Sequence, residues 1–361
     1  MNNSSVILSH STGIDLHDRR VGQRHRGKEQ TVSTNGSLCE EKNVWLDCSL
    51  ITQGNDMKRD ASTLSYVLIT PARNEEAYIE KTIQSVISQK CLPTRWVIVS
   101  DGSTDRTDEI VQKYVMGNSW IEFLRMPEKR ERHFAAKVQC FNAGYERIKD
   151  MYYDIIGSLD ADISFESDYF AFLLSKFLEF PRLGVAGTPF MEGTSHYDYR
   201  FTNIEHVSGA CQLFRRECFE DIGGYVPIKA GGIDWIAVTT ARMKGWMTRT
   251  FTEKTCFHHR PMGTGNSSAF LAWFRLGSKD YFLGNHPLWE MFRSLYQMAK
   301  RPYIIRGSLL LLGYTWSSLK RMNRPASEEL MKFHRSEQMQ RLKSIIDKAI
   351  GLKSLSILWR Q

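Results

Sequence analysis

Two aspartates, Asp160 and Asp162, stand one residue apart in the stretch "GSLDADIS" (157–164), directly after an apolar run. In an extended segment, residues i and i+2 point to the same side. Two carboxylates placed in this way can hold a hard divalent cation together with the phosphate oxygens that it bridges. The simpler alternative is a turn at the end of a strand, where aspartate is common for conformational reasons.

Two other polar clusters also follow apolar runs. "PARNEE" (71–76) comes after "LSYVLIT" (64–70), and "DGSTD" (101–105) comes after "WVIVS" (96–100). Each cluster also has a simple alternative as a turn or a helix cap, and Asn74 stands where it would cap a following helix. Neither cluster is specific by itself, so their positions in the fold must decide between a functional site and a simple turn or helix cap.

The elements around these clusters alternate between strand and helix. Apolar segments at 64–70, 96–100, 121–126 and 154–159 predict strands, and apolar stripes of helical period predict helices at 74–89, 107–115, 134–145 and 168–180. Such alternation predicts a mostly parallel sheet with helices on both faces. Ligands bind beyond the carboxyl ends of the strands in sheets of this kind. The three polar clusters should therefore meet at one edge.

The second half of the chain adds further candidates. A helix is predicted at 233–246, ending near Gly245, and Asp234 stands at its start, where the helix dipole alone favours a carboxylate. A strand is predicted over "MTRTFTEKTCFHH" (247–259), which ends in His258 and His259. Adjacent side chains on a strand point in opposite directions, so at most one of these histidines should face the site.

Composition limits the class of protein. The chain has 361 residues, of which 42% are hydrophobic, and its seven cysteines form no CxxC pair. This pattern argues against a zinc ribbon and against a secreted disulfide framework, and it favours a reducing cytoplasm. We do not expect a signal peptide, since the first ten residues contain only three apolar residues in a row. We do not expect a membrane-spanning segment either, since no apolar run approaches about 18 residues.

Three regions are expected. Residues 1–60 are polar and are expected to form a mostly disordered extension. Residues 61–265 are expected to form a catalytic domain, and residues 266–361 a helical extension rich in basic and aromatic residues. Residues 261–361 hold 16 basic and 6 acidic side chains and thus the whole positive excess of the chain. In 286–324, aromatic residues interleave with cations, which indicates an anionic membrane surface as partner. The alternative is a helix packed on the catalytic domain with a solvated basic face. No nucleic-acid reader motif is present.

Taken in order, "TPARNEEAYIEKTIQSV", "VSDGSTDRT" and "GSLDADIS" resemble the family 2 glycosyltransferases of bacterial surface-polysaccharide synthesis, which are inverting enzymes with the GT-A fold. The resemblance covers roughly residues 64–260. It implies an α/β fold with a mostly parallel central sheet, helices on both faces and a C-terminal helical extension. It also implies a nucleotide-sugar donor and a divalent metal, Mn²⁺ or Mg²⁺.

The resemblance also implies roles for single residues. Asp162 would bind the metal directly, and Asp160 would contact the ribose or a metal-bound water. The remaining nucleotide-binding positions would be the backbone at Pro71 and Ala72, the neighbouring Arg73, the carboxylates of Glu75 and Asp101, and the ribose-side residues Gly102 and Ser103. Many members carry an aromatic or small residue where this chain has Arg73, so the identity of the nucleotide stays open.

Four further residues take expected roles from the same resemblance. Lys137 would lie near the diphosphate, or would only flank the apolar stripe that includes Phe134. Arg260 would pair with phosphate, and His258 or His259 would complete the metal site. Asp234 would be the general base that takes the proton of the attacking hydroxyl; next to it, Ile233 stands where many members have a second acid.

The expected function is therefore metal-dependent transfer of a single sugar to an acceptor hydroxyl. By analogy with the family, this hydroxyl would belong to a lipid-linked glycan at the inner face of the cell membrane. The QxxRW motif and membrane helices of processive synthases are not found in the sequence. Two alternatives stay open: transfer to a polyprenyl phosphate, which needs no base, and a non-catalytic nucleotide-sugar-binding protein. A nucleotidyltransferase would need a glycine-rich phosphate loop after the first strand, which "PARNEE" is not.

Overall fold

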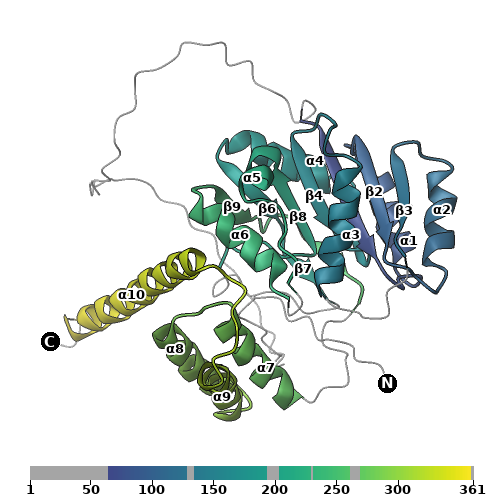
Figure 1. The fold of residues 1–361 in the computed structure, drawn as a ribbon. Helices are drawn as coiled ribbons and strands as arrows, with labels where there is room; N and C mark the ends of the chain where they lie inside the picture. Colours follow the sequence, from purple (N-terminus) through teal and green to yellow (C-terminus); the bar gives the residue numbers. More distant parts are fainter. Residues whose placement is uncertain (1–63, 128–133, 193–202, 229–230, 261–268, 359–361) are drawn as a thin grey trace, which may run out of the picture.

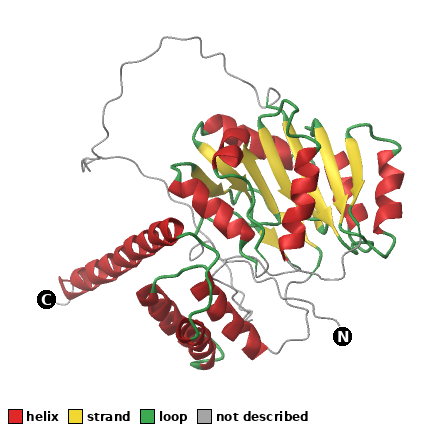
Figure 2. Cartoon of the chain, viewed as in Figure 1, coloured by secondary structure: helices red, strands yellow, loops and turns green. Residues whose placement is uncertain are grey.

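The structure is a computed structural model that describes residues 64–127, 134–192, 203–228, 231–260 and 269–358. An α/β part lies above a group of C-terminal helices in Figure 1. Figure 2 shows the same arrangement by element type, with a yellow sheet between red helices. The predicted extension at 1–60 lies outside the described residues.

The central sheet has seven strands in the order β3-β2-β1-β4-β8-β6-β9. All neighbours are parallel except β8, which runs antiparallel to both β4 and β6. The predicted α/β class with a mostly parallel sheet is confirmed. The strands are β1 (Tyr66–Ala72), β2 (Arg95–Ser100), β3 (Ile121–Arg125), β4 (Ile155–Leu159), β6 (Leu183–Gly187), β8 (Cys211–Arg215) and β9 (Met247–Thr250).

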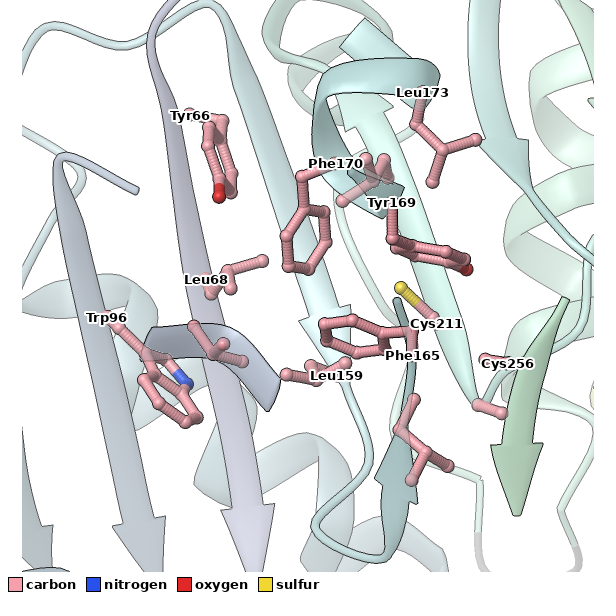
Figure 3. Close-up of a cluster of buried hydrophobic side chains, with 14 of the residues drawn as sticks. Tyr66, Leu68, Trp96, Leu159, Phe165, Tyr169, Phe170, Leu173, Cys211 and Cys256 are labelled. Carbon is pink, nitrogen blue, oxygen red and sulfur yellow. The ribbon is translucent and has the colours of Figure 1, made fainter. Parts of the chain in front are cut away.

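Helices cover both faces because β1 sends alternate side chains to opposite sides. Leu68 joins a buried cluster with α1, α2 and α4, part of which Figure 3 shows, whereas Val67 and Ile69 join a second cluster with α3, α5 and α6. This period of two is the expected geometry of a strand buried on both faces. The helices are α1 (Ile79–Ile87), α2 (Thr107–Val115), α3 (Phe134–Glu146), α4 (Tyr169–Glu179), α5 (Arg216–Asp221) and α6 (Ile233–Met243).

A second, three-stranded sheet consists of β5 (Ile163–Ser164), β10 (Cys256–His258) and β7 (Phe190–Met191), in that order. In its antiparallel pair, His258 is the register partner of Ile163. The sheet therefore carries the segment that ends in the two histidines alongside the segment that follows Asp162.

Two local predictions are wrong. The predicted strand at 247–259 is divided between β9 and β10, which belong to different sheets. The helix predicted from Asn74 begins only at Ile79, and Tyr78 occupies its N-cap position. Asn74 has a positive φ of 55°, and its Oδ1 accepts a hydrogen bond from Thr104 N at 2.9 Å. Instead of capping α1, Asn74 ties the loop after β1 to the loop after β2.

The C-terminal region is helical, as predicted, and consists of α7 (Ala269–Phe282), α8 (Pro287–Met298), α9 (Ile305–Leu319) and α10 (Glu328–Leu358). α9 packs against both α7 and α8 (Figure 1). α10 contacts α6, where Arg242 Nε donates to Glu337 Oε1 at 2.7 Å and Trp235 meets His334 edge-on at 4.5 Å. None of the described helices combines the length and the apolar character needed to cross a membrane.

Candidate active site

Three of the polar clusters predicted from the sequence meet at the carboxyl edge of the sheet. β1 and β2 end side by side, with Ala72 in register with Ser100, and Asp101 N donates to Ala72 O at 2.8 Å. β4 pairs with the other side of β1 and ends just before Asp160. Parallel strands align their carboxyl ends, so side chains far apart in the sequence are brought together.

On the β2 side, a buried carboxylate and a tight loop form the first part of the site. Asp101 is buried, and Arg73 Nη1 lies 3.1 Å from its Oδ2. Gly102 has φ 60°, a conformation that residues with a Cβ rarely adopt. Ser103 Oγ accepts a hydrogen bond from Asn74 N at 3.2 Å. The residues expected to bind the nucleotide thus surround one loop, and Arg73 already pairs with the carboxylate of Asp101.

Arg260 connects the first cluster to the aspartates after β4. Its guanidinium contacts the carboxylate of Glu75, and its Nε lies 3.6 Å from Asp162 Oδ2. Glu75 is buried, and its backbone N–H donates to Thr107 Oγ1 at 2.7 Å. Glu75, Arg260 and Asp162 therefore form a chain of alternating charge across the sheet edge.

Lys137 on α3 hydrogen-bonds the carboxylate of Asp160. Burial lowers the pKa of Lys137, but the carboxylates of Asp160, Asp234 and Asp162 outweigh it, and the net pKa is raised. Burial and the charge of Asp162 raise the pKa of Asp160, and Lys137 opposes them. Lys137 therefore keeps its positive charge inside the site, and this charge faces three carboxylates.

His258 lies next to Asp162, with Nε2 3.6 Å from Oδ1. On the other side of its ring, Nδ1 is 3.3 Å from Glu192 Oε1. Burial lowers the pKa of His258, but Glu192 and the two aspartates overcome it and raise the pKa. His259 has other partners: its Nε2 is 2.8 Å from Ser164 Oγ and its ring stacks on Tyr78. Of the two adjacent histidines, only His258 pairs with the carboxylate of Asp162.

The residue types around Asp160 fit a divalent cation. Two donor atoms that bind one such cation at about 2.0–2.2 Å lie roughly 3–4 Å apart, a range that includes the separation of Asp162 and His258. Among the described residues, however, no three His, Cys, Asp or Glu side chains are arranged to hold a metal ion. Lys137 and Arg260 approach the oxygens of Asp160 and Asp162, so these carboxylates would have to turn from the cations toward a metal.

Asp234 lies in the first turn of α6, whose N-cap Gly232 has φ 87°. A Cβ at Gly209 would come within 3.3 Å of Asp234 Oδ2, so that glycine leaves room for the carboxylate. Burial lowers the pKa of His206 to about 4 against the opposing charge of Asp234. Burial also lowers the pKa of Lys279, which Asp234 and Asp280 oppose. Asp234 is thus flanked by two basic groups with lowered pKa values.

Three residues of this arrangement were not predicted. Glu192 follows β7, whose pairing with β10 has no local sequence signal. His206 comes from the loop before β8, and Lys279 comes from α7 in the C-terminal extension. The excess of basic residues in 261–361 was the available signal for Lys279, but the sequence did not indicate that α7 reaches the catalytic domain.

Comparison with known proteins gives a family and distant relatives. The family described as "Glycosyl transferase family 2" matches residues 67–202. The poly-beta-1,6-N-acetyl-D-glucosamine synthase of Staphylococcus aureus (strain COL) is 28% identical over 170 residues, covering 42% of this chain and 39% of the synthase. The synthase of the same name from Staphylococcus epidermidis is 25% identical over 170 residues, with the same coverage. The chain therefore matches well under half the length of these curated relatives.

Solved structures are similar at lower identity. The mannosyltransferase PcManGT from Pyrobaculum calidifontis, in complex with GDP-Man and Mn²⁺, has a TM-score of 0.48 at 16% identity, covering 78% of this chain and 82% of that one. S. aureus TarS 1-349 in complex with UDP-GlcNAc has a TM-score of 0.47 at 13% identity, covering 71% and 73%. Likenesses at this level do not bear on the ligands of this chain.

Proposed function

We propose that the protein is an inverting glycosyltransferase, because residues 67–202 match the family 2 glycosyltransferases. It moves one sugar from a nucleotide-sugar donor to an acceptor hydroxyl. The observation that carries this proposal is the meeting of Asp160, Asp162 and Asp234 around the Lys137 ammonium, at the sheet edge where β1 and β4 end. One site then contains the carboxylates proposed to act on the donor, Asp160 and Asp162, and the carboxylate proposed to act on the acceptor, Asp234.

On the donor side, the loop formed by Asp101, Gly102 and Ser103 binds the nucleoside, together with Glu75 and the backbone at 71–73. Asp162, His258 and the neighbouring Asp160 would hold Mn²⁺ or Mg²⁺, with one histidine rather than two since the Nε2 of His259 pairs with Ser164. A bound divalent ion supplies charge neutralisation for the departing diphosphate. Lys137 and Arg260 exchange their carboxylate partners for diphosphate oxygens when the donor enters.

On the acceptor side, Asp234 takes the proton of the attacking hydroxyl as the new glycosidic bond forms. A single displacement by that hydroxyl, opposite the departing diphosphate, inverts the configuration at the sugar carbon. Asp234 lies close enough to Lys137 for its charge to act on the ammonium, which also pairs with Asp160. It is held separately from these donor-side residues, in the first turn of α6. His206, whose pKa burial lowers to about 4, is neutral at pH 7.

The acceptor is proposed to be a lipid-linked glycan of surface-polysaccharide assembly, used at the cytoplasmic face of the cell membrane. The names of the curated relatives make an activated N-acetylglucosamine the first donor to test. The basic segment 286–324 would bring the site to an anionic membrane surface, since the C-terminal residues hold the positive excess of the chain.

The test is donor turnover by the purified chain. Nucleotide sugars are screened with Mn²⁺ and with Mg²⁺, and both nucleoside diphosphate release and the anomeric configuration of the product are measured. Turnover with an inverted product is expected, and Asp162→Ala should abolish it while circular dichroism stays unchanged. A chain that binds donor but never releases diphosphate with any acceptor would instead be a nucleotide-sugar-binding protein.

A second candidate, transfer to a polyprenyl phosphate, is favoured by the cation Lys279 near Asp234. A phosphate acceptor is already an anion, so it needs no base. Asp234→Asn separates the two candidates: with a hydroxyl acceptor, kcat should fall by about 10²-fold or more, whereas with a phosphate acceptor most activity should remain. Lys279→Gln should show the reverse preference, with little effect on a neutral acceptor and a raised KM for a phosphate.

A further inference from the structure

The helix α8 has its polar side inside and its apolar side outside. Its buried residues are all polar or charged: Glu290, Arg293, Ser294 and Gln297. Its large apolar side chains at helical spacing are exposed, with Leu288 at 52%, Met291 at 49% and Leu295 at 58%. A helix of a water-soluble bundle has the reverse pattern.

The helix α9, which packs against α8, continues this pattern. Leu312, Trp316 and Leu319 are exposed at 53%, 50% and 82%, and they recur every three or four residues along one face. The residues that α9 buries include Arg306, two glycines and Ser317 as well as Leu310 and Tyr314. We call the six exposed side chains of α8 and α9 the outer apolar face: Leu288, Met291, Leu295, Leu312, Trp316 and Leu319.

The interior of this helix group is held by polar contacts. Arg293 Nη1 hydrogen-bonds Asp280 and lies 3.8 Å from Glu290 Oε2, and all three side chains are buried. Asn285 Nδ2 donates to the same Glu290 oxygen at 3.3 Å. Ionisable groups turned inward and paired with one another are the arrangement found where the surroundings of a helix bundle are apolar.

Glycines allow the backbones of α7, α8 and α9 to approach closely. A Cβ on Gly277 would lie 1.9 Å from Leu310 O, and a Cβ on Gly313 would lie 2.0 Å from Phe274 O. A Cβ on Gly307 would likewise lie 2.1 Å from Ser294 O. Small residues at helix crossings are typical of bundles in lipid, where burial of large apolar side chains between helices gains little.

Cations stand beside aromatic rings near the outer apolar face. Lys320 Nζ is 5.1 Å from the Trp316 ring, and Arg301 lies 5.9 Å from the ring of Tyr303, which is 58% exposed. Long basic side chains can extend from an apolar surface to lipid headgroups, and indole and phenol rings favour the same depth. The cations beside the outer apolar face are complementary in charge to anionic headgroups. The apolar side chains of that face are suited to contact with acyl chains.

We propose that the outer apolar face of α8 and α9 inserts into one leaflet of a lipid bilayer. Its six side chains contact the upper acyl chains, and the basic side chains of Lys300, Arg301, Lys320 and Arg321 contact the headgroups. This goes beyond attraction to a charged surface, because apolar burial gives binding that survives high salt. It does not require transferase activity, since the observations that carry it all lie in α7–α9.

The test is flotation of the full chain with vesicles of neutral phosphatidylcholine and with vesicles that also contain anionic phosphatidylglycerol. Binding to both is expected, stronger to the anionic vesicles, and it should persist in about 1 M NaCl, where the Debye length is about 3 Å. Brominated lipids should quench tryptophan fluorescence, and the quenching should decrease in Trp316→Phe. Binding that requires phosphatidylglycerol and disappears in high salt would overturn insertion.

Variants separate insertion from misfolding. The double variant Leu312→Gln/Leu319→Gln should lower the partition coefficient by ten-fold or more, because each leucine transferred from water contributes about 1.5–3 kcal/mol. Met116→Gln is the matched control, since Met116 is 84% exposed on the catalytic domain and should not change flotation. Thermal unfolding must match wild type in both. If wild type fails to float and elutes as a dimer that the double variant dissociates, the face binds a second copy and the proposal is wrong.

Discussion

His258 Nε2 lies 3.6 Å from Asp162 Oδ1, and two sheets meet at this point. Asp162 follows β4 of the large sheet, and His258 ends β10 of the small one. The antiparallel register of β5 and β10 fixes their proximity, since His258 is opposite Ile163, the residue after Asp162. The small sheet therefore positions an imidazole beside a carboxylate that the large sheet presents.

This pair predicts the metal dependence of the site. Asp162→Asn and His258→Gln should each weaken Mn²⁺ binding by about ten-fold or more, because the first removes a negative charge and the second removes an imidazole nitrogen. His259→Gln is the matched control, since the Nε2 of that ring pairs with Ser164 Oγ. Mn²⁺ titration followed by electron paramagnetic resonance, with nucleoside diphosphate present, measures the affinity. Equal affinities in all three variants would mean that the metal binds elsewhere.

Lys137 predicts an effect on the donor. Lys137→Gln should weaken binding of the nucleoside diphosphate by about 10- to 100-fold, since a charged hydrogen bond contributes about 1.5–3 kcal/mol. Lys113→Gln, a lysine with 70% of its side chain exposed on α2, should leave binding unchanged. Isothermal titration calorimetry measures both affinities. If Lys137 only flanked the apolar stripe of α3, its loss would instead lower thermal stability and leave the affinity intact.

Much of the fold and part of the site follow from local sequence. Buried strands have strong apolar signals, and polar residues at their carboxyl ends, such as Asp101 and Asp160, must meet because parallel strands share an edge. The sequence pattern of residues 233–246 predicts a helix, and Asp234 stands at its start. These predictions depend only on periodicity within short segments and on a general property of parallel sheets.

Other features depend on contacts between distant segments. Glu192 reaches His258 because β7 pairs with β10, and Lys279 approaches Asp234 because α7 packs near α6. Strand pairing of two or three residues has no sequence period to detect. The inverted character of α8 was also not predicted: the spacing of Trp289 and Phe292 indicated the helix, but only the structure shows that Glu290 and Arg293 are buried.

The glycine crossing of α7 and α9 predicts a large loss of stability on a small substitution. Gly313→Ala should lower the free energy of unfolding by at least about 2 kcal/mol, because its Cβ would lie 2.0 Å from Phe274 O and backbone must move. Gly117→Ala is the control, since the nearest atom to its Cβ would be 3.9 Å away. Its effect should stay within about 0.5 kcal/mol. Urea unfolding of both variants gives the comparison, and equal midpoints would contradict the close crossing.

Glu290 predicts how stability depends on pH. Burial and the neighbouring Asp280 raise the pKa of Glu290 to about 8, whereas Arg293 and Asn285 oppose the shift. The folded chain therefore keeps a proton that the unfolded chain, with a carboxyl pKa near 4.5, releases. Stability from this group is fully present below pH 4.5 and is lost as the pH rises through 8.

Glu290→Gln should remove that slope, because the amide cannot ionise. The stability of wild type relative to the variant should thus fall as the pH rises from 5 to about 9. His206, with its pKa lowered to about 4, adds a slope of opposite sign between pH 4 and 6.5, but it is present in both proteins and cancels in the difference. Free energies of unfolding in urea across this range measure the effect, with exposed Glu328→Gln as the control. Parallel pH profiles for wild type and Glu290→Gln would show that Glu290 is ionised in the folded bundle.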